Sequence, residues 1–395
     1  MPPATAPAAS PPETHAQRLR VLAAGVCALV LTVGLARFAY TPLLPIMRAQ
    51  AGLTDVAGGW LATFNYAGYI SGALLAAAIS NVQWKYQLYR LGLVLAVLTT
   101  AAMGLTQDVV LWTLLRFVAG FASTAGMLLA SGLVLNWLIR NGHRPELGLH
   151  FAGVGLGVVV SGVTVGGMAG HLAWDAQWLA LGAGGLLLFV PAWAWLPAPA
   201  ALHASHSVPQ VAPPPRRWLV LMMASYFCAG FGYVVSATFI VAILVKLPLL
   251  AGWGSWAWVL VGLAAAPSSF AWDKVAQALG PVRALLIAYG VQVVSVLIPA
   301  LTDAAGWNLL GALLYGGTFV GIVSLTLTLI GLRYPANPAK AMARLTLSYG
   351  VAQVVAPAMT GYIVAITGSY AGALWVTAGV MGLGMGLLAL LAPER

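Results

Sequence analysis

The sequence predicts an all-α membrane protein with twelve transmembrane helices, and three observations lead to this class. The 395-residue chain is 61% hydrophobic and 7% charged, and its mean hydropathy is +0.92. A soluble domain is about a quarter charged and about half apolar, so lipid suits this chain better than water. Apolar stretches of roughly 20 residues recur from Leu19 to Leu391, and each can cross a bilayer as a helix. The stretches do not alternate as the strands of a membrane β-barrel would.

A Pro/Ala/Ser-rich segment divides the expected helices into two groups of six. It reads "PAPAALHASHSVPQVAPPPR" at residues 197–216 and has the composition of a linker. We expect a disordered cytoplasmic tail at 1–17, a six-helix bundle at 18–196 and a second bundle at 217–395. The expected spans are 19–47, 56–80, 87–107, 109–139, 148–170, 174–196, 217–245, 254–271, 283–301, 305–332, 341–366 and 370–391.

The charge pattern and the cysteines exclude several classes of function. The formal net charge is +10, but most Lys and Arg residues lie singly or in pairs between apolar runs. That distribution is typical of a membrane protein and argues against a nucleic-acid partner. Cys27 and Cys228 lie inside apolar runs and form no metal motif, so we expect no metal and no cofactor. The sequence also has no nucleophile motif and no nucleotide-binding loop, which argues against an enzyme.

The loop charges predict the orientation in the membrane. With the N-terminus inside, the expected inner loops carry most of the Lys and Arg residues, and the outer side carries Asp55, Asp108, Asp175 and Asp303. Positive charges mark cytoplasmic loops. We therefore expect a multi-pass, monomeric protein of the bacterial inner membrane, surrounded by the lipid bilayer, with both termini cytoplasmic.

Two similar segments indicate that the two halves are related. "GVGLGVVVSG" (153–162) and "GVAQVVAPAM" (350–359) occupy corresponding positions in the fifth and eleventh expected helices. Internal repeats of this kind build transporters in which two bundles enclose a site near the middle of the membrane. The repeat therefore predicts two pseudo-symmetric bundles around a central site.

Several longer strings carry a resemblance to a known family. They include "GLARFAYTPLLPIM" (34–47), "ATFNYAGYISGALL" (62–75), "AAAPSSFAWDKVAQALG" (264–280) and "LSYGVAQVVAPAMTG" (347–361). With its twelve spans divided six and six, the chain resembles a major facilitator superfamily transporter of the YbfB/YjiJ-type branch. The resemblance implies secondary active transport by alternating access, and it does not imply one particular substrate.

Two general motifs of that superfamily can be placed on this sequence. The Arg of helix 4 that is followed four residues later by Gly matches Arg116 and Gly120. The motif between helices 8 and 9 matches Asp273, Lys274 and Arg283, and it implies a salt-bridge latch on the cytoplasmic side. The corresponding stretch between helices 2 and 3 lacks its acidic residue.

Arg37 and Arg116 are the two full charges that lie inside the expected spans, away from the span ends. At ~1.5 Å per residue, both lie about 12–15 Å below the outer surface. A charge at that depth costs several kcal/mol by insertion scales, so each should face a cavity or a partner. Helices 1 and 4 line the central cavity of the superfamily, so the two arginines are expected at one site. Two interpretations stay open for each arginine: contact with a substrate, or a structural tie such as a bond from Arg116 to helix 1 carbonyls.

Neutral polar and aromatic residues recur at helical spacing on the neighbouring spans. Guanidinium groups bind carboxylates and phosphates bidentately, so we expect a small organic anion with an apolar or aromatic body. Protons that enter together with the anion are one candidate for the coupling ion, and anion exchange and uniport stay open. An exporter of hydrophobic or drug-like compounds, with both arginines structural, is the alternative. The expected substrate-binding residues are Arg37, Arg116, Asn65, Tyr69, Tyr233, Ser236, Tyr315 and Thr318.

Two further groups of residues are expected to act in gating. Pro42 and Pro45 interrupt the hydrogen-bond ladder of helix 1 just outside Arg37, so that end is expected to bend as an outer gate. Asp273 can also lie at the N-terminus of helix 11, beside Arg344, where the helix dipole favours an anion. The expected gating residues are Pro42, Pro45, Asp273, Lys274, Arg283 and Arg344.

Overall fold

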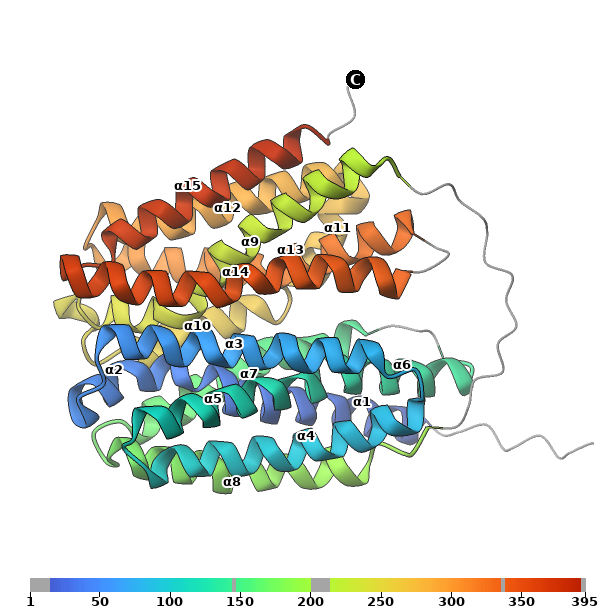
Figure 1. Ribbon diagram of the computed structural model, residues 1–395, viewed down its shortest axis with the longest axis horizontal. Coiled ribbons are helices and arrows are strands. Elements are labelled where there is room, and N and C mark those ends of the chain that lie inside the picture. Colours follow the sequence, from blue (N-terminus) through green and yellow to red (C-terminus); the bar gives the residue numbers. More distant parts are fainter. Residues whose placement is uncertain (1–14, 144–146, 200–213, 335–337, 392–395) are drawn as a thin grey trace, which may run out of the picture.

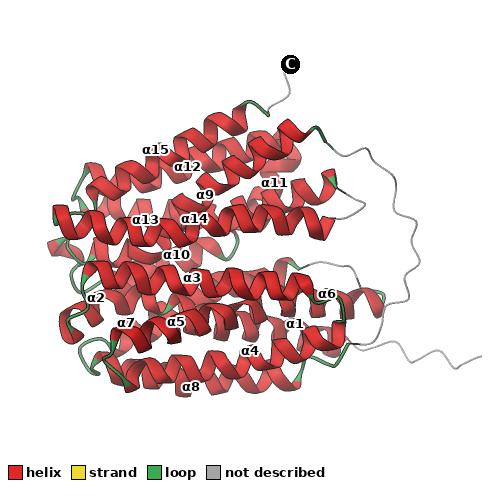
Figure 2. Cartoon of the chain, in the orientation of Figure 1, coloured by secondary structure: helices red, strands yellow, loops and turns green. Residues whose placement is uncertain are grey.

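The computed structural model describes residues 15–143, 147–199, 214–334 and 338–391, and this part of the chain consists of helices and loops without a strand (Figure 2). The first span is one continuous rod that comprises α1 (His15–Leu29), a π-helical segment η1 (Val30–Phe38) and α2 (Tyr40–Ala51). The other helices of the N-terminal half are α3 (Asp55–Ala78), α4 (Val82–Ala102), η2 (Met103–Leu105), α5 (Val109–Thr124), the π-helical η3 (Ala125–Ala130), α6 (Ser131–Arg140), α7 (Gly148–Met168) and α8 (Trp174–Ala194).

The C-terminal half repeats this plan. Its helices are α9 (Arg216–Leu244), η4 (Pro248–Leu250), α10 (Gly254–Ala265), α11 (Ser268–Leu279), α12 (Pro281–Leu301), α13 (Ala305–Arg333), α14 (Pro338–Thr367) and α15 (Ala371–Ala389). The expected single span at 254–271 is wrong in its bounds, because α10 ends before Pro267 and α11 continues to Leu279. Proline removes a helical hydrogen bond and thereby divides this span. The expected tail and linker fall largely on 1–14 and 200–213, which lie outside the described residues.

Ten helical stretches of the described residues are long and apolar enough to cross a membrane. The two other spans are α10, which is short, and α3, which is 24 residues long but carries Asn65, Tyr66 and Tyr69. Large apolar side chains on the outside of the bundle are exposed, as at Leu187 (79%) and Leu383 (62%). Without lipid this surface would face water, so the fold is that of a multi-pass membrane protein.

The two halves form two six-helix bundles that lie one above the other in Figure 1. We call the side that carries the described chain ends, His15 and Leu391, the terminal side, and the opposite side the far side. In Figure 1 the terminal side is on the right and the far side on the left. The bundles meet where α3 packs against α14, α7 against α10 and α2 against α9.

Glycines allow the backbones to approach closely where helices cross. Gly34 of η1 lies against the main chain of Gly157 of α7, and Gly155 of α7 lies against Gly262 and Ala266 of α10. A side chain at these glycines would meet backbone atoms of the neighbouring helix. Small residues are the usual means of close helix packing in membranes, because backbone proximity replaces the hydrophobic effect there.

The first span is irregular before its prolines and not at them. The Ala39 N–H donates to the Gly34 carbonyl at 2.9 Å, which is the i→i−5 bond of a π-helix, and α2 then runs through Pro42 and Pro45 to Ala51. The helix thus continues past both prolines, and bending of this end as an outer gate stays a prediction. Pro42 lies in the first turn of α2, where helices tolerate proline because the N–H has no intrahelical partner.

Candidate functional site

Arg37 lies at the centre of the molecule, inside a cage of aromatic rings. All nine residues of η1 are buried, and the Arg37 side chain is only 6% exposed. Its guanidinium carbon lies 4.3 Å from the ring centre of Tyr66, 4.7 Å from that of Tyr69 and 5.7 Å from that of Phe38. Within the described residues, its buried Nε has no hydrogen-bond partner and the side chain forms no ion pair. The cation is thus stabilised by ring faces and has no anionic partner.

Arg116 is buried beside Arg37 and has a different set of contacts. Its Nη1 donates to the Ala36 carbonyl at 2.9 Å and its Nη2 donates to the Arg37 carbonyl at 3.2 Å. Its guanidinium carbon also lies 4.5 Å from the ring centre of Tyr40, and among the described residues only its Nε lacks a partner. These bonds are the tie between helices 4 and 1 that the sequence left open, and they end on the π-helical segment that carries Arg37.

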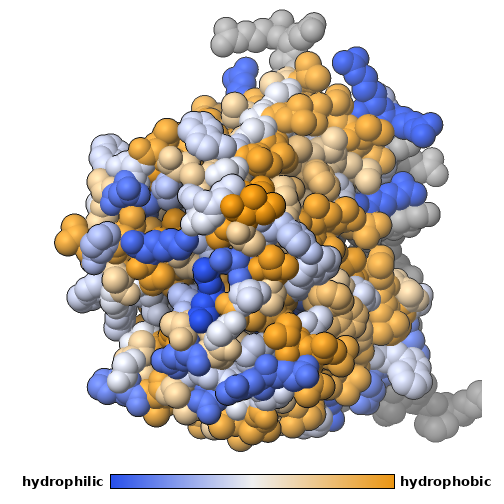
Figure 3. All heavy atoms as spheres, turned by 60° about the vertical axis from the view of Figure 1, so that its left-hand side comes forward, coloured by the Kyte–Doolittle hydropathy of each residue, from blue (hydrophilic) through white to orange (hydrophobic). Residues whose placement is uncertain are grey.

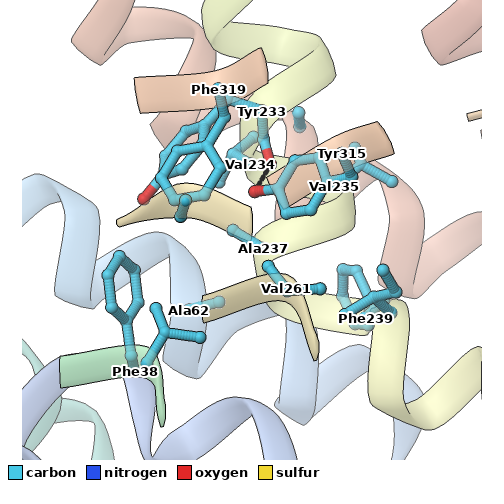
Figure 4. Close-up of a cluster of buried hydrophobic side chains, with 14 of the residues drawn as sticks. Phe38, Ala62, Tyr233, Val234, Val235, Ala237, Phe239, Val261, Tyr315 and Phe319 are labelled. Atoms are coloured by element: carbon cyan, nitrogen blue, oxygen red, sulfur yellow. Dashed lines mark hydrogen bonds between the residues drawn. The ribbon is translucent and has the colours of Figure 1, made fainter. Parts of the chain in front are cut away.

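The C-terminal bundle places a stack of aromatic rings opposite the arginines. Tyr233 of α9 stacks on Tyr349 of α14 at 5.7 Å and on Phe319 of α13 at 5.5 Å between ring centres. The edge of Tyr66 meets Tyr233 at 6.3 Å, which joins this stack to the Arg37 cage across the two bundles. Figure 4 shows the surrounding buried cluster, to which the N-terminal bundle contributes Phe38 and Ala62.

The hydroxyl groups of the predicted site bind mostly to nearby main chain. The Tyr315 hydroxyl donates to the Tyr233 carbonyl at 3.0 Å, which fixes α13 against α9 (Figure 4). Thr318 donates to the Leu314 carbonyl of its own helix at 2.8 Å, and Ser236 is buried on α9. Asn65 donates from Nδ2 to the Arg116 carbonyl at 2.8 Å, which connects α3 to α5. Tyr315 and Asn65 thus hold neighbouring helices together, and the part of these residues in substrate binding stays a prediction.

A cavity of about 540 Å³ lies between the bundles on the terminal side. The N-terminal bundle contributes residues of α3, α4 and the fourth span, from Ile70 next to Tyr69 down to Lys85. The C-terminal bundle contributes Leu327 of α13 and Met342, Thr346 and Leu347 of α14. The bundles are therefore separated on the terminal side at this level, and the residues that line the cavity do not include those of the aromatic cage.

The predicted latch between helices 8 and 9 is not formed among the described residues. Asp273, Lys274 and Arg283 are exposed at the terminal side, as is Arg344. The Lys274 ammonium lies 4.5 Å from the ring centre of Phe270 and makes no ion pair within the described chain.

Sequence reasoning missed part of the aromatic site. Tyr66 and Tyr349 contact the centre of the site, and Tyr226 stacks on Tyr349 at 4.5 Å. The spacing of Tyr66 and Tyr69, three residues apart on one helix, could have placed both on one face. No local pattern marked Tyr349, because its partners come from a helix more than a hundred residues away in the sequence.

Comparison with known proteins decides the family. The family profile described as "Uncharacterised MFS-type transporter YbfB" matches residues 29–389. The chain belongs to this transporter family. No curated protein matches the sequence significantly. The family is one of membrane transporters that work by alternating access, so this transporter is not an enzyme.

Solved structures support the same fold. A mutant of the nucleoside transporter NupG superposes with a TM-score of 0.76 at 12% identity, covering 95% of this chain and 100% of NupG. A bacterial homologue of the human lysosomal transporter Spinster, in an inward-facing and unoccupied conformation, gives a TM-score of 0.68 at 15% identity, covering 96% of this transporter and 97% of the homologue. At these identities the likeness concerns the fold alone.

Proposed function

We propose that this transporter carries a small organic anion across the bacterial inner membrane, and that Arg37 is the group that binds it. The terminal side is then cytoplasmic, in agreement with the positive loop charges, and both chain ends lie inside. The observation that carries the proposal is the buried Arg37 guanidinium, which has aromatic neighbours but no anionic partner in the described residues.

The charge balance of the site favours an anionic ligand. Arg37 and Arg116 lie side by side, and none of the eight acidic residues of the chain lies deep within an expected span. Arg116 already donates to two carbonyls, whereas the Nε of Arg37 has no hydrogen-bond partner among the described residues and can donate to a ligand. A carboxylate that binds Arg37 would neutralise a charge whose burial is otherwise costly.

The aromatic stack defines the rest of the ligand. Tyr66, Tyr69, Tyr233 and Tyr349 are each less than one-tenth exposed and surround the arginine from both bundles. Ring faces favour an apolar or planar body, because offset and edge contacts with aromatic rings add to its burial. An aromatic carboxylate therefore matches both parts of the site.

The same charge balance bears on how substrate transport is coupled to a proton gradient. Many proton-coupled transporters of this superfamily carry the proton on a membrane carboxylate, and no carboxylate lies deep within the expected spans of this transporter. We propose that the substrate carries the proton as its own carboxylic acid: Arg37 binds the carboxyl group in the site, and the acid loses its proton to water after release. An imposed pH gradient across proteoliposomes should then drive uptake of a carboxylate, and uptake that ignores the gradient would contradict this coupling.

The test compares Arg37→Met with Arg90→Met in proteoliposomes. Arg90 is the control, because its guanidinium also lies on aromatic rings, 4.1 Å from Trp193, but outside the central site. The probes are benzoate, acetate, glucose 6-phosphate and the neutral nucleoside adenosine. Loss of one charge-assisted bidentate contact should weaken anion binding about 100-fold in Arg37→Met, and Arg90→Met should leave it unchanged.

The alternative is an exporter of neutral or hydrophobic compounds, in which both arginines are structural. The carbonyl bonds of Arg116 agree with such a role for that residue. NupG is described as a nucleoside transporter, so adenosine also probes for a neutral planar substrate. Adenosine transport that is unaffected in Arg37→Met, with no transport of any anion, would replace the anion proposal by this one.

A further inference from the structure

Four polar side chains meet on the far side, at four different helix ends. Arg48 is in the last turn of α2 and Asp55 is the first residue of α3, so both belong to the N-terminal bundle. Lys246 follows α9 and Tyr370 precedes α15, so both belong to the C-terminal bundle. Figure 3 brings this side forward and shows hydrophilic residues gathered on it.

One side chain connects the two bundles through this group. Arg48 binds the Asp55 carboxylate from Nη2 at 2.6 Å, which is the sole ion pair within the described residues. From its other terminal nitrogen, Nη1, Arg48 donates to the hydroxyl of Tyr370 at 3.0 Å. Asp55 thus neutralises and orients a guanidinium that reaches across to the other bundle.

Tyr370 is held from its own bundle. The Lys246 ammonium lies 4.8 Å from the centre of the Tyr370 ring and donates to the Gly368 carbonyl at 3.4 Å. The Phe239 ring packs against Tyr370 at 5.6 Å, and Tyr370 is only 5% exposed. The hydroxyl that accepts from Arg48 is therefore at a fixed place on the C-terminal bundle.

We infer that Arg48, Asp55, Tyr370 and Lys246 form a clamp that holds the far side closed, and that it must open for the site to face the far side. In alternating access the bundles separate on one side as they close on the other. The Arg48–Tyr370 bond joins one bundle to the other, so it cannot persist when the far side opens. Its free energy counts only in the far-side-closed state and shifts the balance toward that state.

Backbone contacts below the clamp keep the far side closed as well. Gly59 of α3 lies against Gly361 and the Pro357 carbonyl of α14, and Thr63 donates to the Val354 carbonyl at 2.8 Å. Loss of the clamp should therefore shift the balance between the two states without locking the protein in one of them.

The experiment measures the distance between the far-side ends of the bundles and needs no substrate. Spin labels replace Val110 and Leu249, which are exposed on the far side of the N- and C-terminal bundles, in a background with both native cysteines changed to Ala. Double electron–electron resonance in nanodiscs then gives the ratio of open to closed far sides. Tyr370→Phe and Asp55→Asn should each raise this ratio about threefold, as expected for a partly exposed ion-pair contact.

Asp108→Asn is the matched control. Asp108 also begins a far-side helix, where it caps the Val110 and Leu111 amides, but it makes no contact with the other bundle within the described chain. Tyr370→Phe keeps the ring that packs on Phe239 and Lys246, so it isolates the hydroxyl and decides the matter if Asp55→Asn does not fold. An unchanged ratio in Tyr370→Phe, or an equal rise in Asp108→Asn, overturns the clamp.

Discussion

Arg37 and Arg116 should respond in opposite ways when they are replaced by methionine. Both side chains are buried at nearly the same depth, and Met has a similar length without the charge or the donors. The difference between them lies in their partners: Arg116 donates to two main-chain carbonyls, whereas Arg37 contacts aromatic rings only within the described residues. The stability of the two variants therefore tests whether these contacts are as described.

The contacts of the two arginines give the expected size of each change in the free energy of unfolding. Two hydrogen bonds from a charged donor contribute about 1.5 kcal/mol each after desolvation, so Arg116→Met should lower the free energy of unfolding by about 3 kcal/mol. Arg37→Met gives up cation–π contacts of about 1 kcal/mol each with Tyr66 and Tyr69, while the Phe38 ring at 5.7 Å lies near the distance limit of such contacts and adds little. It also removes an unpaired charge that costs about 2.5–3.5 kcal/mol at mid-membrane. We expect Arg37→Met to be equal to the wild type or more stable by about 1 kcal/mol.

The assay is reversible unfolding by sodium dodecyl sulfate in mixed micelles, followed by the fluorescence of the tryptophans. Wild type, Arg37→Met and Arg116→Met are compared without added organic anions, because a bound anion would stabilise the wild type through Arg37. Equal losses in both variants would refute the distinction between the two arginines. A larger loss in Arg37→Met than in Arg116→Met would show that Arg37 is the structural residue.

Three further predictions concern packing. Gly120→Ala should lower stability by about 2 kcal/mol, because a methyl group there would run into the main chain of α3; the unfolding titration measures it. Gly59→Val should raise the open-to-closed ratio of the far side, since its side chain would meet the main chain of α14; Gly167→Val, which meets nothing nearby, is the control in the spin-label assay. Tyr315→Phe should lower the free energy of unfolding by about 1 kcal/mol, because the Tyr233 carbonyl loses the hydroxyl that donates to it.

Each of these has an outcome that contradicts it. Wild-type stability for Gly120→Ala would mean that α3 and α5 lie farther apart than described. A closed far side in Gly59→Val would mean that the bundles do not meet at this glycine. No change for Tyr315→Phe would mean that the hydroxyl bond between α13 and α9 contributes nothing to stability.

Hydropathy in the sequence was enough for the number of spans and the two bundles, although not for the bounds of the span at 254–271, and the resemblance of several strings indicated the family. These are properties of single helices and loops: an apolar run of the right length must cross the membrane, and its flanking charges are local. The same local reasoning placed Arg37 and Arg116 at one level, because depth along a helix follows from residue number.

Contacts between helices could not be predicted from the properties of single helices. The sequence allowed Arg116 to bind either a substrate or helix 1, and only the packed structure shows its donors on the Ala36 and Arg37 carbonyls. Tyr349 joined the site, and Arg48 met Tyr370, through pairs that lie far apart in the sequence. Sequence by itself determined which segments enter the membrane and how deep each charge lies, since both depend on transfer from water to lipid. Tertiary structure decided which of those charges have partners and which side of the bundle is closed, since both depend on the rotation and approach of helices that no local pattern specifies.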